Sequence, residues 1–206
     1  KLLHQTPAGQ ALSTAAGLEM LPADGGDVLV SSCDHSVVID EKKWQRFRSF
    51  PDCEAAILTV RGFPGCNERP NAFAYVLEDG TSSSEFPLVQ KVAVKQPLSA
   101  KPSRDALLVG TFWFKNSDVA KLAIQGLVDA DLRVNGELYL DSVFEILLRQ
   151  GLKIRSFPLE GYVNWGDPDS LAEALYWQEV FLGRKFPPRS RWPGVFLKPS
   201  SFSEDA

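Results

Sequence analysis

Histidine and cysteine are scarce in this chain of 206 residues, which contains two histidines and three cysteines. With His4 and His35 as the only histidines, no Ser/His/Asp catalytic triad can be argued, and His35 is expected to be a surface loop residue. Three cysteines are an odd number, and their irregular spacing fits neither a disulfide framework nor a zinc site. Because reduced cysteines are typical of the cytoplasm, the sequence predicts a cytoplasmic protein.

Long apolar runs and a strong excess of one charge are also missing. The longest apolar stretch, residues 106–114, is broken by Gly110 and Thr111 and is too short to span a membrane. A net charge of -4 gives no reason to expect nucleic acid as a partner. Neither a signal peptide nor an initiator Met opens the chain, so Lys1 is expected to be a cut end.

One apolar stretch, residues 28–34, is predicted to be a buried strand, because turn residues precede it. This strand ends in the carboxylate of Asp34. Ligands of open α/β sheets lie beyond the carboxyl ends of strands, and hard divalent cations prefer carboxylate oxygens. Asp34 is therefore a candidate metal ligand, and a turn-capping role is the alternative.

Apolar periodicity and turn signals divide the rest of the chain into alternating strands and helices. These patterns predict a mixed, mostly parallel α/β sheet flanked by helices. They favour one domain over residues 1–183, followed by a Pro-rich basic tail over residues 184–206. Residues 61–71 are expected to form a loop and residues 162–167 a turn. The predicted strands are 28–34, 55–60, 73–77, 89–95, 107–114 and 153–157, and the predicted helices are 6–21, 41–50, 117–129, 138–150 and a final one from Pro168.

Five stretches in this order resemble the sugar-phosphate nucleotidyltransferases, whose catalytic domain has a Rossmann-like α/β fold. The similarity runs from about residue 5 to 182. The first is Gly-Gln-Ala at 9–11 before a helix, followed by a strand that ends in Cys-Asp at 33–34. The others are Val-Lys-Gln-Pro at 94–97, Leu-Val-Gly-Thr-Phe-Trp-Phe at 108–114, Asn-Gly-Glu-Leu-Tyr at 135–139, and Tyr-Val-Asn-Trp-Gly-Asp-Pro-Asp-Ser-Leu at 162–171.

The resemblance implies a reaction between a nucleoside triphosphate and a sugar phosphate. An oxygen of a sugar 1-phosphate would attack the α-phosphorus, and pyrophosphate would leave. Positioning and charge neutralisation carry most chemistry of this kind. The implied cofactor is Mg²⁺.

Roles for individual residues also follow from the resemblance. Gly9 and Gln10 would lie against the nucleobase, and Asp34 would hold Mg²⁺. Lys95 would contact the sugar phosphate, with a solvated strand end as the alternative.

Gly110 and Glu137 would line the sugar pocket. Gly110 could instead allow close strand packing. Glu137 could instead be an acid favoured at a helix start.

Two features depart from the family pattern. The family opens with a strand and a Gly-rich loop that carries an Arg and a Lys and grips the triphosphate, and this sequence contains no such loop. We expect truncation rather than loss of activity, because Asp34 and Lys95 are present. The second departure is Asn164, which stands where better-known members have a second metal-binding Asp; its amide oxygen can ligate a metal but brings no charge.

Three functions remain open at this stage. The first is a sugar-phosphate nucleotidyltransferase, and the second is a non-catalytic sugar-nucleotide-binding or regulatory domain of the same fold. The third, a glycosyltransferase of related fold, is disfavoured because Ser32-Cys33-Asp34 lacks the two acids that usually flank one residue at the metal strand. The kind of sugar, the kind of nucleotide and the oligomeric state are left open.

Overall fold

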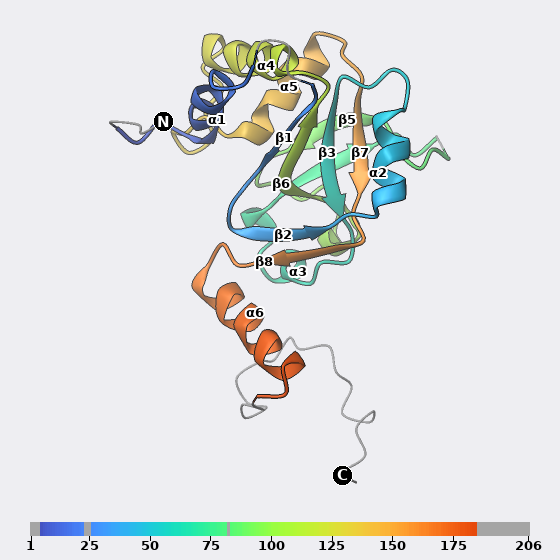
Figure 1. Cartoon of the computed structure of the whole chain (residues 1–206), viewed down its shortest axis with the longest axis vertical. Helices are drawn as coiled ribbons and strands as arrows, with labels where there is room; N and C mark the ends of the chain where they lie inside the picture. Colours follow the sequence, from blue (N-terminus) through green and yellow to red (C-terminus); the bar gives the residue numbers. More distant parts are fainter. Residues whose placement is uncertain (1–4, 23–25, 82, 185–206) are drawn as a thin grey trace. The chain divides into compact units, whose positions relative to one another are not determined.

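The computed structural model describes residues 5–22, 26–81 and 83–184. The contacts within the chain divide it into two compact units that meet between Val163 and Asn164, and each unit is described by itself. The first unit contains a central six-stranded sheet with helices on both of its faces (Figure 1). The predicted α/β architecture with helices flanking the sheet is confirmed.

The strand β6 is the centre of this sheet, and every residue of it except Gly110 is buried. Its run of aliphatic and aromatic residues suits a strand that is covered on both faces. The strand order is β5-β4-β6-β3-β7, and β1 pairs with β6 as well. The strands are β1 (Val28–Ser31), β3 (Ala55–Val60), β4 (Ala74–Glu78), β5 (Val89–Ala93), β6 (Ala106–Phe114) and β7 (Ile154–Pro158).

The directions of these strands differ from the expectation of a mostly parallel sheet. Strand β6 runs antiparallel to β1, β3 and β4, and β4 runs antiparallel to β5. The parallel pair is β3 with β7. The expectation was wrong on this point because alternating helices and strands do not dictate which strands become neighbours, and neighbours decide the directions.

One edge of β6 is shared by two strands. Because β3 pairs along the other edge, β1 and β4 must both lie on this one. Strand β4 pairs with residues 106–108 and β1 with residues 111–114. No described strand lies beside Val109 and Gly110 on this edge, so the sheet is interrupted there.

Alternate residues of the strands face two separate cores. Ala55 and Ile57 of β3 face one side, where they pack with helices α1 (Gln10–Leu18), α4 (Ser117–Asp129) and α5 (Val143–Arg149). Ala56 and Leu58 face the other side, where Phe47 of helix α2 (Glu41–Arg48) is buried (Figure 1). The cap of α4 is Asn116, whose side chain accepts from the amide of Val119 at 3.0 Å, one residue earlier than the predicted Ser117.

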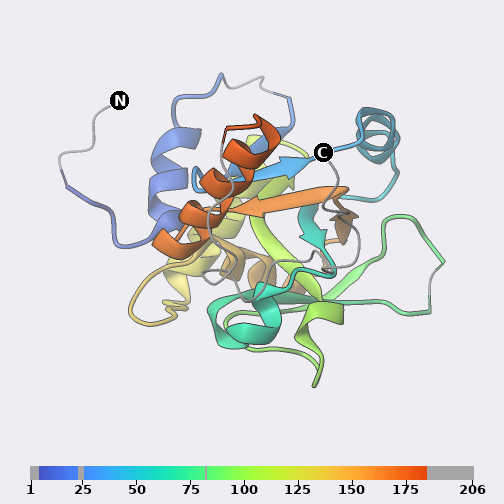
Figure 2. The same ribbon diagram turned by 90° about the horizontal axis from the view of Figure 1, so that it is seen from below.

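A second, two-stranded sheet joins β2 (His35–Val38) to β8 (Gly161–Asn164), and the two strands lie side by side in opposite directions (Figure 2). The turn expected at residues 162–167 therefore begins as a strand. The loop expected at residues 61–71 contains helix α3 (Gly65–Glu68) and the first residues of the 3-10 turn η1 (Pro70–Ala72). Two further 3-10 turns are η2 (Pro102–Arg104) and η3 (Leu140–Ser142).

Strand β1 is not the buried strand that the sequence predicts. It has four residues, and their burial alternates between intermediate and exposed, with Leu29 49% exposed. This pattern fits a strand at an edge with one face toward solvent. Asp34 consequently stands in a short connection between β1 and β2, outside the core.

The second unit contains α6 (Pro168–Phe181), which begins where the sequence predicts. Asp167 caps it by accepting from the amide of Ser170 at 3.0 Å, and a proline at the first helical position needs no hydrogen bond. The predicted tail lies outside the described residues from position 185 onward. None of the helices in the described ranges is both long and apolar enough to cross a membrane.

Candidate functional site

The N-terminus of α1 packs directly on the segment around Leu138. The amide of Ala11 donates to the Leu138 oxygen at 3.1 Å, and the amide of Leu138 donates to the Ala8 oxygen at 3.2 Å. Gly9 has a φ of 123°, and a β-carbon there would lie 2.5 Å from the Leu138 oxygen. Only glycine fits both the conformation and the space, so Gly9 and Gln10 lie against the stretch that contains Glu137.

A tight turn presents Glu137 and Tyr139. Val134 and Glu137 exchange two backbone hydrogen bonds, at 3.0 and 3.1 Å. Asn135 and Gly136 between them have positive φ angles, 51° and 82°. Asn-Gly is the pair that such a two-residue turn requires. Glu137 is exposed beside it.

Lys95 reaches this stretch from the end of β5. Its Nζ donates to the Tyr139 hydroxyl at 3.2 Å and lies 4.9 Å from the centre of the Tyr139 ring. Lys95 is half-buried and has a φ of 53°, which is uncommon for a residue with a β-carbon. The structure therefore brings together Gly9, Gln10, Glu137 and Lys95, four of the residues that the sequence singled out.

A second group gathers at the end of β1. Gly110, with a φ of 72°, accepts from the amide of Ser32 at 3.1 Å, and a β-carbon there would lie 3.4 Å from Cε1 of His35. Nε2 of His35 lies 2.8 Å from the Thr111 hydroxyl oxygen, and its Nδ1 lies 3.6 Å from Oδ1 of Asp34. Gly110, His35 and Asp34 thus form one local group.

His35 is not the surface loop residue that the sequence predicts. It opens β2, its side chain is 4% exposed, and its ring centre lies 5.7 Å from that of Tyr162. Burial lowers the pKa of His35, and the carboxylate of Asp34 opposes that shift. The Asp34 side chain is 55% exposed, so it faces solvent while the histidine beside it is packed.

The strand register relates the end of β5 to β6. Ala93, the last residue of β5, pairs with Tyr75, and Tyr75 pairs with Leu107. Ser32 donates to the Gly110 oxygen, at the interruption in the β6 edge.

Tyr139 and Asp141 also belong to the first group, although the sequence reading gave them no role. Oδ1 of Asp141 is buried and has no hydrogen-bond partner among the described residues. Burial raises the pKa of Asp141 to about 6, and the charge of Lys95 is among the influences that lower it. Both residues lie at the start of a predicted helix, and periodicity alone gives no sign that Tyr139 contacts a lysine from a distant part of the chain.

Asn164 makes its described hydrogen bonds within its own turn. Its amide nitrogen donates to the Ser170 hydroxyl at 3.1 Å, and its oxygen accepts from the amide of Gly166 at 3.2 Å. These bonds stabilise the entry to α6. A metal-binding role for Asn164 stays a prediction.

The side chains at this site suit Mg²⁺ only if most of its ligands come from water and substrate. Within the part of the chain that the structure describes, no group of three or more His, Cys, Asp or Glu side chains could hold a metal ion. Mg²⁺ is often bound by one or two carboxylates, with waters and substrate phosphates as the remaining ligands. The exposed carboxylate of Asp34 suits that manner of binding.

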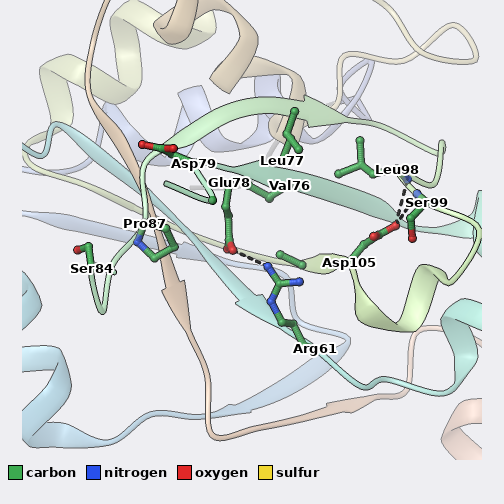
Figure 3. Close-up of a pocket in the computed structure, with 12 residues that line it drawn as sticks. Arg61, Val76, Leu77, Glu78, Asp79, Ser84, Pro87, Leu98, Ser99 and Asp105 are labelled. Carbon is green, nitrogen blue, oxygen red and sulfur yellow. Dashed lines mark hydrogen bonds and ion pairs between the residues drawn. The ribbon is translucent and has the colours of Figure 1, made fainter. Parts of the chain in front are cut away.

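Two surface hollows lie apart from these groups. One, of about 430 Å³, is lined by residues that include Arg61, Glu78 and Asp105 (Figure 3). Arg61 and Glu78 form an ion pair at 2.5 Å, and Asp105 accepts from two backbone amides, so each of these side chains already has a partner. The other, of about 570 Å³, is lined by residues that include Asp27 and Trp113. Neither hollow contains a residue that the sequence predicts to be functional.

No protein-family model matches the chain. No curated protein matches its sequence either. The comparison with solved structures, in contrast, finds many similar folds.

A nucleoside-diphosphate-sugar pyrophosphorylase from Vibrio cholerae is 20% identical, with a TM-score of 0.63 over 84% of this chain and 67% of that one. A UDP-glucose pyrophosphorylase complexed with UDP-glucose is 10% identical, with a TM-score of 0.65 over 88% and 64%. A putative glucose-1-phosphate thymidylyltransferase from Bacillus anthracis is 15% identical, with a TM-score of 0.58 over 89% and 65%.

The chain spans about two thirds of the length of each of these structures. Their names are those of two nucleotide-sugar pyrophosphorylases and a glucose-1-phosphate thymidylyltransferase. The chain therefore has the fold of the sugar-phosphate nucleotidyltransferases, as the resemblance in its sequence implied.

Proposed function

We propose that this chain takes part in the transfer of a nucleotidyl group from a nucleoside triphosphate to a sugar 1-phosphate, which gives a nucleotide sugar and pyrophosphate. The observation that carries the proposal is the position of Lys95. Its amine is held on Tyr139, in the same stretch that packs against Gly9. A lysine near the N-terminus of a helix that is capped by a glycine is an arrangement suited to a phosphorylated ligand.

The substrates would be divided between the two groups of residues. Gly9 and Gln10 bind the nucleobase, and Glu137 and Gly110 line the sugar pocket. Gly110 has no β-carbon, so a ligand can approach the backbone where the β6 edge is interrupted. Lys95 contacts the phosphate of the sugar phosphate.

In the reaction, an oxygen of the sugar phosphate attacks the α-phosphorus of the triphosphate. The bond from that phosphorus to the β-phosphate oxygen breaks, and pyrophosphate leaves. Lys95 neutralises and orients the attacking phosphate, which would otherwise be repelled by the triphosphate. Asp34 would hold Mg²⁺, which supplies charge neutralisation on the triphosphate.

We place the protein in the cytoplasm, because none of the three cysteines, all within the described residues, forms a disulfide, and reducing compartments keep thiols in that state. Its partners in this proposal are a nucleoside triphosphate and a sugar phosphate.

The alternative is a non-catalytic domain that binds sugar nucleotides. This alternative is favoured by one observation: the 206 residues contain no Gly-rich loop with an Arg and a Lys to grip a triphosphate. The same residues would then bind a finished nucleotide sugar without turnover.

One experiment separates the two functions. The chain is incubated with Mg²⁺, glucose 1-phosphate and each nucleoside triphosphate in turn, and released pyrophosphate is measured. In parallel, UDP-glucose and dTDP-glucose are titrated into it by calorimetry. Pyrophosphate release that Lys95→Met abolishes supports the transferase, and binding without release supports the alternative. If the chain neither releases pyrophosphate nor binds a nucleotide sugar, both proposed functions are wrong.

A further inference from the structure

Lys95 is a half-buried lysine that is not paired with an acid. Two lysines of the described ranges are half-buried, Lys43 and Lys95, and the others are exposed. The Lys43 amine lies 3.0 Å from a carboxylate oxygen of Glu160 and donates to the Pro158 carbonyl oxygen at 2.6 Å. The Lys95 amine has the neutral Tyr139 hydroxyl instead, at 3.2 Å, and no ion pair joins it to an acid in the described part of the chain. Because water compensates a half-buried charge only in part, the surroundings of Lys95 favour an anionic ligand.

The hydroxyl of Tyr139, rather than the face of its ring, holds the Lys95 amine. The amine lies 3.2 Å from the hydroxyl oxygen and 4.9 Å from the ring centre. A lysine ammonium can only donate, so the hydroxyl oxygen is the acceptor in this hydrogen bond. The hydroxyl therefore keeps its own hydrogen, for which no acceptor is found among the described residues. The ammonium also has further hydrogens to donate. The pair thus presents a positive charge and free donors but lacks an acceptor.

The backbone fixes Tyr139 on the side of its segment that is not packed in the core. Tyr139 is extended, with a φ of -75° and a ψ of 141°, so its neighbours in sequence point to the opposite side. Leu138 and Leu140 are buried there, in the core that also contains residues of α1 and α5. The amide of Ser142 donates to the Tyr139 carbonyl oxygen at 3.2 Å. This bond and the two bonds between Leu138 and the start of α1 hold the segment in place.

We propose that the Tyr139 hydroxyl is a phosphate-binding group: it accepts from the Lys95 amine and donates its own hydrogen to the phosphate that this amine neutralises. The identification of that phosphate as part of a sugar 1-phosphate rests on the function proposed above. An ammonium on a flexible stem acts on an anion as a point charge, whereas a hydroxyl on a fixed ring donates in a restricted set of directions. Tyr139 would therefore orient the phosphate that Lys95 attracts.

The first test follows Tyr139 in the whole chain. The chain is labelled with 3-fluorotyrosine at its four tyrosines, and the fluorine signal of Tyr139 is identified by its absence from Tyr139→Phe. Titration with inorganic phosphate and, separately, with glucose 1-phosphate should move this signal to a saturating position, because the neighbouring hydroxyl gains an acceptor. The signal of Tyr75 is the internal control and should not move, because Tyr75 is buried and its hydroxyl donates to the Pro70 carbonyl oxygen at 2.9 Å.

The outcomes separate this inference from the proposed function. A shift of the Tyr139 signal with glucose 1-phosphate supports both. A shift with inorganic phosphate alone supports the phosphate site and contradicts a sugar phosphate as its ligand. If glucose 1-phosphate binds in calorimetry while the Tyr139 signal stays in place, the proposed function stands and the role of Tyr139 is overturned. A signal that neither probe moves also overturns it.

Affinity measurements test the hydroxyl itself. Tyr139→Phe removes the hydroxyl and keeps the ring, so it should weaken the probe that moves the fluorine signal about tenfold, as expected for one hydrogen bond to a charged group. The matched control is Tyr75→Phe, which removes a hydroxyl that is bonded to a backbone carbonyl and should leave the affinity unchanged. Equal affinities of the parent and Tyr139→Phe would overturn the proposal.

The response of Tyr139 to phosphate should also depend on Lys95. In Lys95→Met, phosphate at a concentration that saturates the parent should leave the Tyr139 fluorine signal in place, because the charge that attracts the anion is gone. Lys91→Met removes an exposed amine from β5 and should respond as the parent does. A purely structural role of Tyr139 would not make its response to phosphate depend on a lysine charge. A shift of parental size in Lys95→Met would mean that the two side chains do not share one phosphate, and the proposal would fail.

Discussion

Lys95 holds a backbone conformation that residues with a β-carbon usually avoid. Its φ of 53° lies in the left-handed region, where contact between the β-carbon and the carbonyl oxygen costs about 1–2 kcal/mol. Strained backbone of this kind concentrates at functional sites, because the surrounding structure must maintain it. The strain and the hydrogen bond to Tyr139 together favour a functional lysine over a solvated strand end.

Two substitutions of Lys95 separate strain from chemistry. Lys95→Ala keeps the β-carbon and its backbone strain, whereas Lys95→Gly removes both. The glycine variant should therefore be more stable than the alanine variant by about 1 kcal/mol in urea unfolding. Both should abolish glucose 1-phosphate binding. Lys91→Ala, on the exposed face of β5, is the control and should leave binding unchanged. An alanine variant as stable as the glycine variant would rule out the strain.

Asp34 is exposed, so its removal should affect ligands more than folding. Asp34→Ala should abolish the Mg²⁺-dependent part of nucleotide binding, measured by calorimetry with and without Mg²⁺. The free energy of unfolding should change by no more than about 0.5 kcal/mol, as for surface substitutions. Asp129→Ala, an exposed acid at the end of α4, is the control. A variant that unfolds yet keeps its response to Mg²⁺ would show that Asp34 is structural.

At the scale of elements, two helices carry a glycine at positions with opposite surroundings. A β-carbon at Gly17 of α1 would meet nothing within 4 Å. A β-carbon at Gly126 of α4 would lie 2.6 Å from a methyl group of Ile146 in α5. Glycine at the first position therefore serves no packing need, whereas at the second it lets two helices approach closely.

Alanine substitution should consequently have opposite effects at the two sites. Gly17→Ala should raise the free energy of unfolding by about 0.5–1 kcal/mol, through helix propensity and a less flexible unfolded chain. Gly126→Ala should lower it by about 1–3 kcal/mol, because the α4–α5 contact is overpacked. Urea unfolding followed by circular dichroism checks both. The same sign at the two positions would contradict the packing seen between α4 and α5.

For the whole molecule, the buried acid Asp141 predicts a dependence of stability on pH. Burial raises its pKa from 3.8 to about 6. Below about pH 4 it is protonated in both the folded and the unfolded state. As the pH rises through 6, the Asp141 carboxyl must ionise while it is buried in the folded state. The free energy of unfolding then falls by about 3 kcal/mol because of this group.

The measurement compares the parent with Asp141→Asn at several pH values. The difference in unfolding free energy should move in favour of Asn by about 3 kcal/mol between pH 4 and pH 7. Asp27 acts in the opposite direction, because the hydrogen bonds from Trp113 and Arg48 outweigh burial and lower its pKa. Its contribution is the same in both proteins and therefore cancels from the difference in unfolding free energy. A difference that stays constant with pH would mean that Asp141 is not buried as a charge.

Local patterns were sufficient for most elements. The run Ala-Ala-Ile-Leu-Thr-Val at Ala55–Val60 is the strand β3 without a shift at either end, because small and β-branched residues bounded by polar ones leave little choice. Pro168 marks the start of α6 in the same way. The weaker case was β1, since a strand of four residues, three of them apolar, cannot show whether both of its faces are covered.

The sequence by itself determined most of the helices and strands and the resemblance to the nucleotidyltransferases, because each depends on residues close together in the chain. Tertiary structure alone decided the antiparallel neighbours of β6, the interruption of its edge at Gly110, and the burial of His35. It also decided that Lys95 and Tyr139 meet. Such contacts join residues far apart in sequence, and they depend on strand register and packing, which no local pattern encodes.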